Sequence, residues 1–238
     1  MPNNYFQFKQ FTVFQDKCAM KVCTDACLFG AMVPPAPPKG EYSVFDIGTG
    51  TGLLSLMFAQ KNPAAIIDAV EIDEDASEQA KDNFVTSPWP ERLNIFHADI
   101  LNFDPQKKYD CIISNPPFFE DDLKSTDENK NNAKHDTSLS LIQLLQIVES
   151  HLNRDGIFAV LLPYHRVNYF IEEASKFDLY LNQQILVRQT PKHDYFRGIL
   201  FFSTVKTQLQ NTEIIIKDNE GKYTDAFVAA LKDYYLYL

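Results

Sequence analysis

Short runs of apolar residues alternate along this chain with longer stretches whose apolar residues recur at helical spacing. The apolar runs are typical of buried strands, and the stretches between them are typical of helices that bury one face. Strands that alternate with helices of this length form right-handed β–α–β units in a parallel sheet. We expect strands at Tyr42–Ile47, Ile66–Ile72, Leu93–His97, Tyr109–Ser114 and Ile157–Leu162, and helices at Leu53–Lys61, Glu74–Thr86, Leu139–Leu152 and Arg166–Phe177.

The alternation ends after the last of these helices. Two strand-like runs, Leu181–Gln189 and Gly198–Lys206, follow one another with no helical stretch between them. Without a helix to cross over, such strands pair antiparallel. The sequence therefore predicts an α/β fold with a doubly wound, Rossmann-like, seven-stranded and mostly parallel sheet that has an antiparallel last strand.

The same pattern predicts one domain over residues 1–238. Residues 1–40 precede the sheet and end in a proline-rich break, residues 41–206 carry the alternation, and residues 207–238 form a C-terminal extension with a short strand (Ile214–Lys217), a turn and a helix. Residues 120–137 are polar and highly charged. A loop of that length in a compact domain is usually functional or disordered.

Composition bounds the kind of protein. Hydrophobic residues make up 45% of the chain and aromatic residues 13%, which is typical of a packed globular protein. No apolar run is long enough to span a bilayer and no signal peptide is visible, so we expect a cytoplasmic protein without a membrane segment. The four cysteines lack the paired spacing of a zinc site, so we expect reduced thiols and no metal.

The net charge of −10 argues against a nucleic-acid partner, because phosphate binding needs clustered lysines and arginines. The charge is unevenly spread, however. Residues 1–24 and residues 185–200 each carry a net charge of +2, which leaves −14 for the rest of the chain. These two segments either meet on one face of the fold or are ordinary solvated charges, and the sequence leaves both interpretations open.

A glycine-rich turn, Asp46–Gly52, follows the first predicted strand of the sheet and opens the next helix. Glycines let a backbone turn tightly and approach a ligand closely, and the helix N-terminus presents free N–H groups. The turn lacks the Gly-Lys-Ser/Thr of a Walker loop, and Leu53 stands where a dinucleotide fingerprint needs its third glycine. What remains is a D-x-G-x-G-x-G turn, which alone is weak evidence for a nucleotide-like ligand.

Acidic residues stand at the ends of the next two predicted strands. Glu71 comes 19 residues after Gly52. In doubly wound sheets a carboxylate at that position hydrogen-bonds ribose hydroxyls, and Ile72 beside it can cover an adenine ring. Asp99 can accept a hydrogen bond from an adenine amino group while Ile100 packs on the ring. The simpler interpretations are a helix N-terminal charge for Glu71 and a turn residue for Asp99.

The fourth strand end carries Asn115-Pro116-Pro117-Phe118. This tetrad supplies a planar amide, two stiff prolines and an aromatic face, a set that suits a flat substrate with an exocyclic amine. Asn115 and the Pro116 carbonyl can accept the two amine hydrogens while Phe118 stacks on the ring, so we expect these three residues to be catalytic. Phe119 either shares the stacking or belongs to the core. All four elements fall at carboxyl ends of strands, where ligands bind in open α/β sheets.

This ordered combination resembles the class I S-adenosylmethionine-dependent methyltransferases over roughly residues 20–205. Asp46–Gly52 resembles their first motif, Glu71 their acidic ribose ligand and Asp99 their adenine contact. The tetrad is similar to the [D/N/S]PP[Y/F/W] motif of the members that methylate a planar amino nitrogen. The resemblance implies S-adenosyl-L-methionine as cofactor, bound by Lys21, Thr24, Asp46, Gly48, Gly50, Gly52, Glu71, Ile72, Asp99, Ile100 and Asn115.

Within this class the N-terminal segment resembles the valine-tRNA adenine-37 N6-methyltransferase family. Members of that family usually have glycines where this chain has Cys23 and Ala26. The resemblance implies that Lys21–Asp25 borders the methionine end of the cofactor and that the substrate is adenine N6 in a tRNA. It is carried by Phe8–Val13, Cys18–Val22, Thr24-Asp25 and Leu28–Ala31.

Enzymes with such a tetrad also methylate adenines of ribosomal RNA or DNA and glutamine amides of proteins. The known protein-glutamine enzymes have a helical domain ahead of the first motif, and about 45 residues before Asp46 leave no room for one. DNA enzymes typically add a target-recognition domain, for which about 30 residues after the last core strand are too few. A catalytically silent scaffold usually loses the glycines or the tetrad, and this chain keeps both.

We therefore expect a small monomeric enzyme that acts on tRNA. The contacts to RNA phosphates would come from the two locally basic segments. The candidate residues are Lys9, Lys17, Lys21, Arg188, Lys192 and Arg197.

Replacement of Phe118 tests the stacking. Phe118→Ala should weaken use of the RNA substrate by about 5- to 150-fold, because a base stacked on an aromatic side chain is worth about 1–3 kcal/mol. Phe118→Tyr keeps the aromatic face and should be tolerated. Steady-state methylation with labelled cofactor measures both, and an alanine variant as active as the parent would contradict the assignment.

Overall fold

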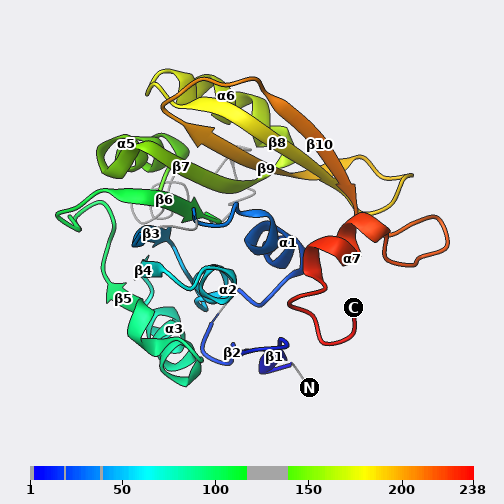
Figure 1. The fold of residues 1–238 in the computed structure, drawn as a ribbon, viewed down its shortest axis with the longest axis horizontal. Helices are drawn as coiled ribbons and strands as arrows, with labels where there is room; N and C mark the ends of the chain where they lie inside the picture. Colours follow the sequence, from blue (N-terminus) through cyan, green and yellow to red (C-terminus); the bar gives the residue numbers. More distant parts are fainter. Residues whose placement is uncertain (1–2, 19, 38–39, 117–138) are drawn as a thin grey trace, which may run out of the picture.

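The computed structural model describes residues 3–18, 20–37, 40–116 and 139–238. An eight-stranded sheet in the order β10-β8-β9-β7-β6-β3-β4-β5 forms its centre (Figure 1). The central strands are rich in buried Val, Ile and Phe because helices cover both of their faces. The strands are β3 (Tyr42–Ile47), β4 (Ala65–Glu71), β5 (Leu93–His97), β6 (Tyr109–Ser114), β7 (Leu152–Pro163), β8 (Tyr180–Arg188), β9 (Tyr195–Ser203) and β10 (Gln210–Ile215).

The expected mostly parallel α/β fold is confirmed. β9 lies between β7 and β8 and runs antiparallel to both, whereas the remaining pairs of this sheet are parallel. The sheet has eight strands rather than the expected seven, because β10 joins its edge beside β8. The antiparallel strand, β9, is therefore the last strand of the predicted core in chain order, but β10 follows it in the sheet.

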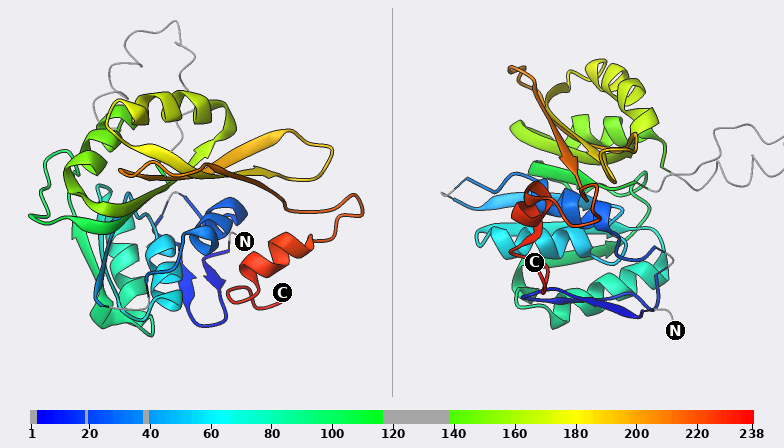
Figure 2. Two further views of the ribbon diagram at one scale, coloured as in Figure 1. Left: turned by 45° about the horizontal axis from the view of Figure 1, so that its top comes forward. Right: turned by 90° about the vertical axis from the view of Figure 1, so that its right-hand side faces the viewer.

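Helices lie on both faces of the sheet (Figures 1 and 2). Buried side chains of α1, α2, α3 and α7 belong to one apolar cluster with one face of the strands, and those of α5 and α6 belong to a second cluster with the other face. The helices are α1 (Thr24–Met32), α2 (Leu53–Lys61), α3 (Glu74–Thr86), α5 (Leu141–His151), α6 (Val167–Ser175) and α7 (Asp225–Leu231), with 3-10 turns η1 (Pro90–Arg92) and η2 (Tyr164–Arg166). In the described ranges no helix has the length and apolar character needed to cross a membrane.

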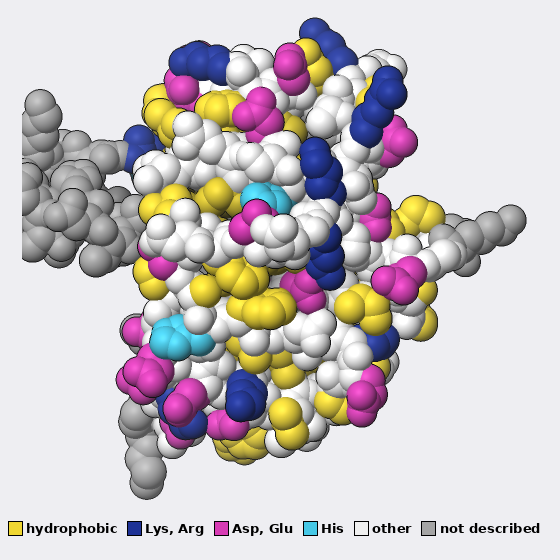
Figure 3. Space-filling view, turned by 90° about the vertical axis from the view of Figure 1, so that its left-hand side faces the viewer, with side chains coloured by type: hydrophobic (Ala, Val, Ile, Leu, Met, Phe, Trp, Pro, Cys, Tyr) yellow, Lys and Arg dark blue, Asp and Glu magenta, His cyan; other side chains and the backbone are white. Residues whose placement is uncertain are grey.

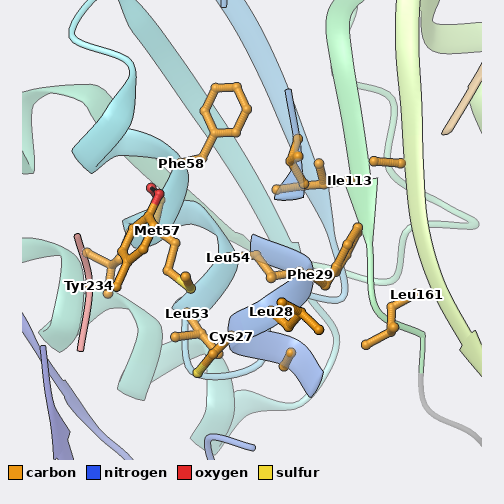
Figure 4. Close-up of a cluster of buried hydrophobic side chains, with 14 of the residues drawn as sticks. Cys27, Leu28, Phe29, Leu53, Leu54, Met57, Phe58, Ile113, Leu161 and Tyr234 are labelled. Atoms are coloured by element: carbon orange, nitrogen blue, oxygen red, sulfur yellow. Dashed lines mark hydrogen bonds between the residues drawn. The ribbon is translucent and has the colours of Figure 1, made fainter. Parts of the chain in front are cut away.

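α1 packs closely on α2. Figure 4 shows side chains of α1 (Cys27, Leu28 and Phe29) and of α2 (Leu53, Leu54 and Met57) within the larger apolar cluster. Gly30 makes the close approach possible, because a Cβ at this position would stand 2.7 Å from the Met57 sulfur. The packing fixes the direction in which α1 points toward the sheet edge.

Lys61 holds the other end of α1. Its ammonium group donates hydrogen bonds to the carbonyl oxygens of Gly30 (2.9 Å), Ala31 (3.0 Å) and Val33, which are unpaired acceptors at a helix C-terminus. Burial lowers the pKa of Lys61 to about 8. With its C-terminal end held here, α1 presents its N-terminal residues at the carboxyl edge of the sheet.

The first and last residues of the chain pack together. β1 (Tyr5–Gln7) and β2 (Thr12–Phe14) form an antiparallel hairpin, which no period in the sequence predicted because each strand has only three residues. The Lys9 amide donates to the Tyr234 carbonyl (2.8 Å), and Phe8 bridges to Tyr235. Figure 2 shows the C-terminal segment beside this hairpin.

A substitution in the hairpin measures how much the hairpin contributes to the free energy of unfolding. Phe8 is 1% exposed, and its ring centroid lies 4.5 Å from that of Phe11. Phe8→Ala should lower the free energy of unfolding by about 3–5 kcal/mol, because it removes buried surface and leaves a cavity. Tyr5→Ala, at an exposed position of the same hairpin, should change it by less than about 0.5 kcal/mol. Urea denaturation compares the two, and similar small losses would show that the hairpin lies outside the cooperative fold.

Candidate active site

The ends of four parallel strands form one edge of the sheet. β3 lies between β4 and β6, and β5 borders β4. Ile47 at the end of β3 is level with Val70 of β4 and Ser114 of β6. Residues at and just beyond these strand ends therefore share this edge. The sequence candidates in this row are Asp46, Gly48, Gly50, Gly52, Glu71, Ile72, Asp99, Ile100, Asn115 and Pro116.

The glycine turn has the backbone that its sequence predicts. Gly48, Gly50 and Gly52 have φ values of 72°, 56° and 81°, a region that favours glycine. A Cβ added to Gly48 or Gly50 would have no atom within 4 Å, so these two glycines border open space. A Cβ on Gly52 would stand 2.5 Å from the Phe84 ring. Gly52 thus serves packing against α3, and the other two leave room beside the backbone.

The buried Asp46 carboxylate stabilises the conformation of the glycine turn. One carboxylate oxygen, Oδ2, accepts hydrogen bonds from Thr49 Oγ1 and Ser55 Oγ, both at 2.6 Å. The residue is completely buried, and burial raises the pKa of its carboxyl to about 6, although the two hydroxyl bonds act in the opposite direction. The carboxylate therefore links the end of β3, the glycine turn and the first turn of α2.

Glu71 connects the end of β4 to the same turn. Its Oε2 accepts a hydrogen bond from the Gly50 amide (2.8 Å), and its Oε1 accepts from the amides of Ile72 (2.9 Å) and Asp73 (3.0 Å). A carboxylate offers about four acceptor positions, so these three bonds leave capacity for a ligand hydroxyl. The structure thus brings the second strand end and the glycine turn together.

Asp99 forms a turn, as its simpler interpretation predicted. It accepts hydrogen bonds from the Leu101 amide (3.0 Å) and the Asn102 side chain (2.8 Å). Ile100 beside it is buried in the second apolar cluster, whereas Ile72 is 52% exposed. These contacts do not test the predicted adenine contact, which stays a prediction.

Asn115 follows β6 directly, as expected, and Pro116 is buried beside it. Asn115 Oδ1 is buried, and the described part of the chain offers it no hydrogen-bond partner. Phe118 and Phe119 lie outside the described residues, so the stacking role predicted for them stays a prediction.

A ligand with amine and hydroxyl donors fits this edge. Asp46 Oδ1 is, like Asn115 Oδ1, buried without a partner among the described residues. A buried acceptor left unpaired costs about 1–3 kcal/mol, so two of them on neighbouring strands indicate a missing donor. The open space beside Gly48 and Gly50 and the spare capacity of Glu71 complete the arrangement.

The segment ahead of α1 is bonded to residues that flank the β1–β2 hairpin. The Val22 amide donates to Gln15 Oε1 (2.8 Å), and the Lys21 ammonium donates to the Asn3 carbonyl (3.3 Å). Thr24 is exposed at the start of α1. No contact among these tests the predicted role of Lys21 and Thr24 at the cofactor.

Lys9 and Lys17 are engaged with other parts of the chain. The Lys9 ammonium bonds to the carbonyl oxygens of Lys232 and Leu238, and Lys17 pairs with Glu78 (3.3 Å) and Asp82 (3.0 Å) of α3. Figure 1 places the β1–β2 hairpin, which carries Lys9, apart from the turn between β8 and β9. Phosphate contacts by these lysines stay predictions. To contact a phosphate, each lysine would have to give up its present partners in the chain.

The second basic segment does lie at the carboxyl edge, because it spans the turn between β8 and β9. Lys192 is exposed on that turn. Arg188 pairs with Glu213 (2.5 Å), and Arg197 pairs with Asp25 of α1 (2.7 Å). The Asp25 pair joins β9 to the first turn of α1, two elements 172 residues apart in the chain.

Sequence reasoning missed several residues that shape this edge. Thr49 lies within the glycine turn and Ser55 follows it closely, so their hydroxyl spacing was a signal that could have been used. The pairing of Asp25 with Arg197 and the ring contact of Tyr164 with Tyr195, whose centroids are 5.3 Å apart, join partners too distant in sequence for any local pattern to reveal.

Nothing in the described ranges groups three or more His, Cys, Asp or Glu as a metal site would require. Burial raises the pKa of Cys27 and Cys111 to about 12, so both remain thiols at neutral pH.

Solved structures of methyltransferases share this fold. A protein from Agrobacterium tumefaciens described as a predicted O-methyltransferase aligns with a TM-score of 0.66 at 14% identity, over 88% of this chain and 96% of that chain. A methyltransferase from Pyrococcus furiosus aligns with a TM-score of 0.58 at 20% identity, over 81% and 88%. The fold is that of the class I methyltransferases.

Comparison of sequences identifies the family. The methyltransferase small domain model matches residues 30–158. A tRNA1(Val) (adenine(37)-N6)-methyltransferase of Flavobacterium johnsoniae is 40% identical over 97% of this chain and 99% of that protein, and one of Cytophaga hutchinsonii is 42% identical over the full length of both. The chain belongs to the tRNA1(Val) (adenine(37)-N6)-methyltransferase family, which confirms the resemblance found in the sequence.

The buried carboxylate of Asp46 should make stability depend on pH. Its pKa of about 6 lies above the unfolded value of about 3.8, so the folded state binds the extra proton between these values. The contribution of Asp46 to stability is therefore present below pH 4 and lost as pH rises through 6, by on the order of 3 kcal/mol.

Asp46→Asn removes this titration. The free energy of unfolding of the parent minus that of the variant should fall between pH 4 and pH 7, measured by urea denaturation at fixed ionic strength. A difference that stays constant over this range would mean that Asp46 does not titrate between pH 4 and pH 7, which would contradict the expectation.

Proposed function

We propose that this chain transfers a methyl group from S-adenosyl-L-methionine to N6 of an adenine in tRNA, at position 37 of a valine tRNA. The observation that carries the proposal is the buried oxygen of Asn115, which has no hydrogen-bond partner among the described residues and lies beside a glycine turn that borders open space. The relatives described above, which match over nearly the whole chain, support the choice of substrate.

The cofactor would be held by the first three strand ends. Glu71 would accept hydrogen bonds from the ribose hydroxyls, and the glycine turn would pass close to the amino-acid part. Ile72 and Ile100 would flank the adenine ring, with Asp99 at its amino group. Asp46 Oδ1, which has no partner in the described part of the chain, would accept a hydrogen bond from an amine donor. The remaining proposed contacts are Lys21, Thr24 and Asn115.

When bound, S-adenosyl-L-methionine supplies a methyl group already activated by a positively charged sulfur. The residues of the chain would position the acceptor. Asn115 Oδ1 and the Pro116 carbonyl would accept the two hydrogens of the adenine amine. These bonds draw the nitrogen out of conjugation with the ring and stabilise the positive charge that develops on it. The protonated product is acidic and loses its proton to water, so no strong general base is needed.

The RNA would approach from the carboxyl edge. Lys192 is exposed on the β8–β9 turn at this edge, and Arg188 and Arg197 lie on the flanking strands. We propose these three as the first phosphate contacts, with Lys9 and Lys17 as outer ones. Phe118 would stack on the extruded adenine and Phe119 would support it.

The organisation of the chain fits a single catalytic domain. Residues 41–206 would form the core, with residues 1–40 flanking the cofactor. Residues 207–238 would be an extension that secures the N-terminal segment, because Tyr234 and Tyr235 bind the β1–β2 hairpin. We propose that it works as a cytoplasmic monomer.

A panel of acceptors tests the proposal. The protein is incubated with methyl-labelled cofactor and, separately, total tRNA, bulk ribosomal RNA, DNA and protein extract. We expect label in tRNA, at N6 of the adenine next to the valine anticodon when the tRNA is digested and analysed by mass spectrometry. Label confined to protein, ribosomal RNA or DNA would overturn the choice of substrate.

Asn115→Ala tests the mechanism in the same assay. Loss of an acceptor that acts in the transition state should reduce methyl transfer by at least roughly 100-fold. Binding of the cofactor, followed by calorimetry, should change little. Asn153→Ala is the matched control. Asn153 lies at the start of β7, away from the site, and its side-chain amide donates to the Asp110 carboxylate of β6 (2.7 Å). Comparable turnover of the Asn115 variant would rule out the proposed role.

A further inference from the structure

An exposed tyrosine follows the strand that neighbours the site. β7 pairs with β6 so that Val160 is level with Ser114. Continuing this register puts Pro116 level with Leu162 of β7, and adjacent strands lie about 5 Å apart. β7 ends at Pro163 and Tyr164 opens η2 directly after it, so Tyr164 stands on the rim of the site.

The ring of Tyr164 is supported by a connected set of side chains. Its centroid is 5.3 Å from that of Tyr195. The Tyr195 hydroxyl donates to Glu213 (2.7 Å) and accepts from Arg188 (2.8 Å), whose guanidinium lies 4.5 Å from the Tyr195 ring centroid. Hydrogen bonds from Tyr195 and Arg188 hold the pKa of Glu213 below its usual range, so the set stays charged and bonded at neutral pH.

Core packing does not account for this ring. Tyr164 is 42% exposed, and neither it nor Tyr195 belongs to the two apolar clusters of the described residues. A large aromatic face that is both exposed and held in place is a prepared surface for a flat partner. Tyr164 also begins η2, which is followed by α6, so its backbone is fixed by regular structure.

Charge alone would not single out this rim. Figure 3 looks onto the side of the molecule where the chain enters β6, and Lys and Arg side chains also line one border of that face, with Asp and Glu between them. The rim differs in placing an aromatic face beside Asn115, with Lys192 exposed on the adjacent turn. The combination of a stacking face and a nearby cation is typical of sites for single-stranded nucleic acid.

We propose that Tyr164 stacks on the unpaired base next to the target adenine in the substrate RNA. The inference rests on the proposed function and extends it to a second nucleotide. Turning the target adenine out of a loop unstacks its neighbour, whose exposed face then needs a partner. Tyr164 covers that face, while Lys192 neutralises a phosphate of the same stretch.

Binding of a synthetic stem-loop with the valine anticodon measures this contact. Tyr164→Ala should weaken binding by about 5- to 150-fold, as expected for loss of one stacked base, whereas Tyr164→Phe should bind as the parent does. Tyr5→Ala is the matched control, because Tyr5 is 49% exposed and its ring contacts Phe14 at 6.3 Å, on the β1–β2 hairpin. Binding of S-adenosyl-L-methionine alone should be the same in all four proteins.

Abasic nucleotides identify the base that is stacked. Two further stem-loops carry an abasic site immediately before or immediately after the target adenine. For the parent, one of the two should bind more weakly than the intact RNA by the same factor as the Tyr164→Ala substitution. The same abasic site should not weaken RNA binding by Tyr164→Ala any further, because that variant has already lost the stacking contact.

Two outcomes overturn the inference. One is a Tyr164→Ala variant that binds the intact RNA as tightly as the parent. The other is an abasic site that weakens the parent and the variant equally. Either leaves the proposed function in place if the parent still methylates tRNA. Failure of the parent to methylate any tRNA, with cofactor binding intact, would instead reject the proposed function and this extension of it together.

Discussion

The parallel register of β3 with β4 and β6 is the constraint on which the site depends. Because the strands run in one direction, every chain segment that leaves the sheet at this edge does so beside the others. Ile47, Val70 and Ser114 stand level, so residues far apart in sequence become neighbours. Direct bonds then join them, because the Ser114 hydroxyl donates to the Ile47 carbonyl (2.9 Å) and the Gly48 amide donates to the Val70 carbonyl (3.0 Å). The Asp46 carboxylate then locks the first of these segments by bonding Thr49 and Ser55 at once.

Local patterns in the sequence sufficed for most of this frame. The strands from β3 to β9 are recognisable because each is an apolar run of a length that fits a buried strand, and the glycine turn is recognisable because only glycine adopts its backbone readily. Asn115 was located for the same reason, since it directly follows such a run. In each case the signal and the structure it produces lie within a few residues of one another.

Features formed between distant segments were not predictable in this way. The first four residues of β10, Gln210–Glu213, are exposed and polar, so only their pairing with β8 makes them part of a strand. The Asp25–Arg197 pair and the Tyr164–Tyr195 ring contact depend on where the sheet carries β7 and β9. An excess of basic residues likewise says nothing about their partners, and Lys17 proved to be paired with α3. Sequence patterns report propensity and burial, whereas pairing across the fold requires the completed topology.

The contact of the β1–β2 hairpin with residues 234–235 sets the order in which the protein can mature. Phe8 and Lys9 are bound by Tyr234 and Tyr235, which leave the ribosome long after the hairpin does. The sheet from β3 to β9 can assemble before then, but the hairpin that leads into Lys21–Asp25 cannot reach its final place until residues 234–235 have been synthesised. A nascent chain that has emerged only as far as β9 therefore carries a formed glycine turn and an unfinished flank, so that the two sides of the site mature at different times.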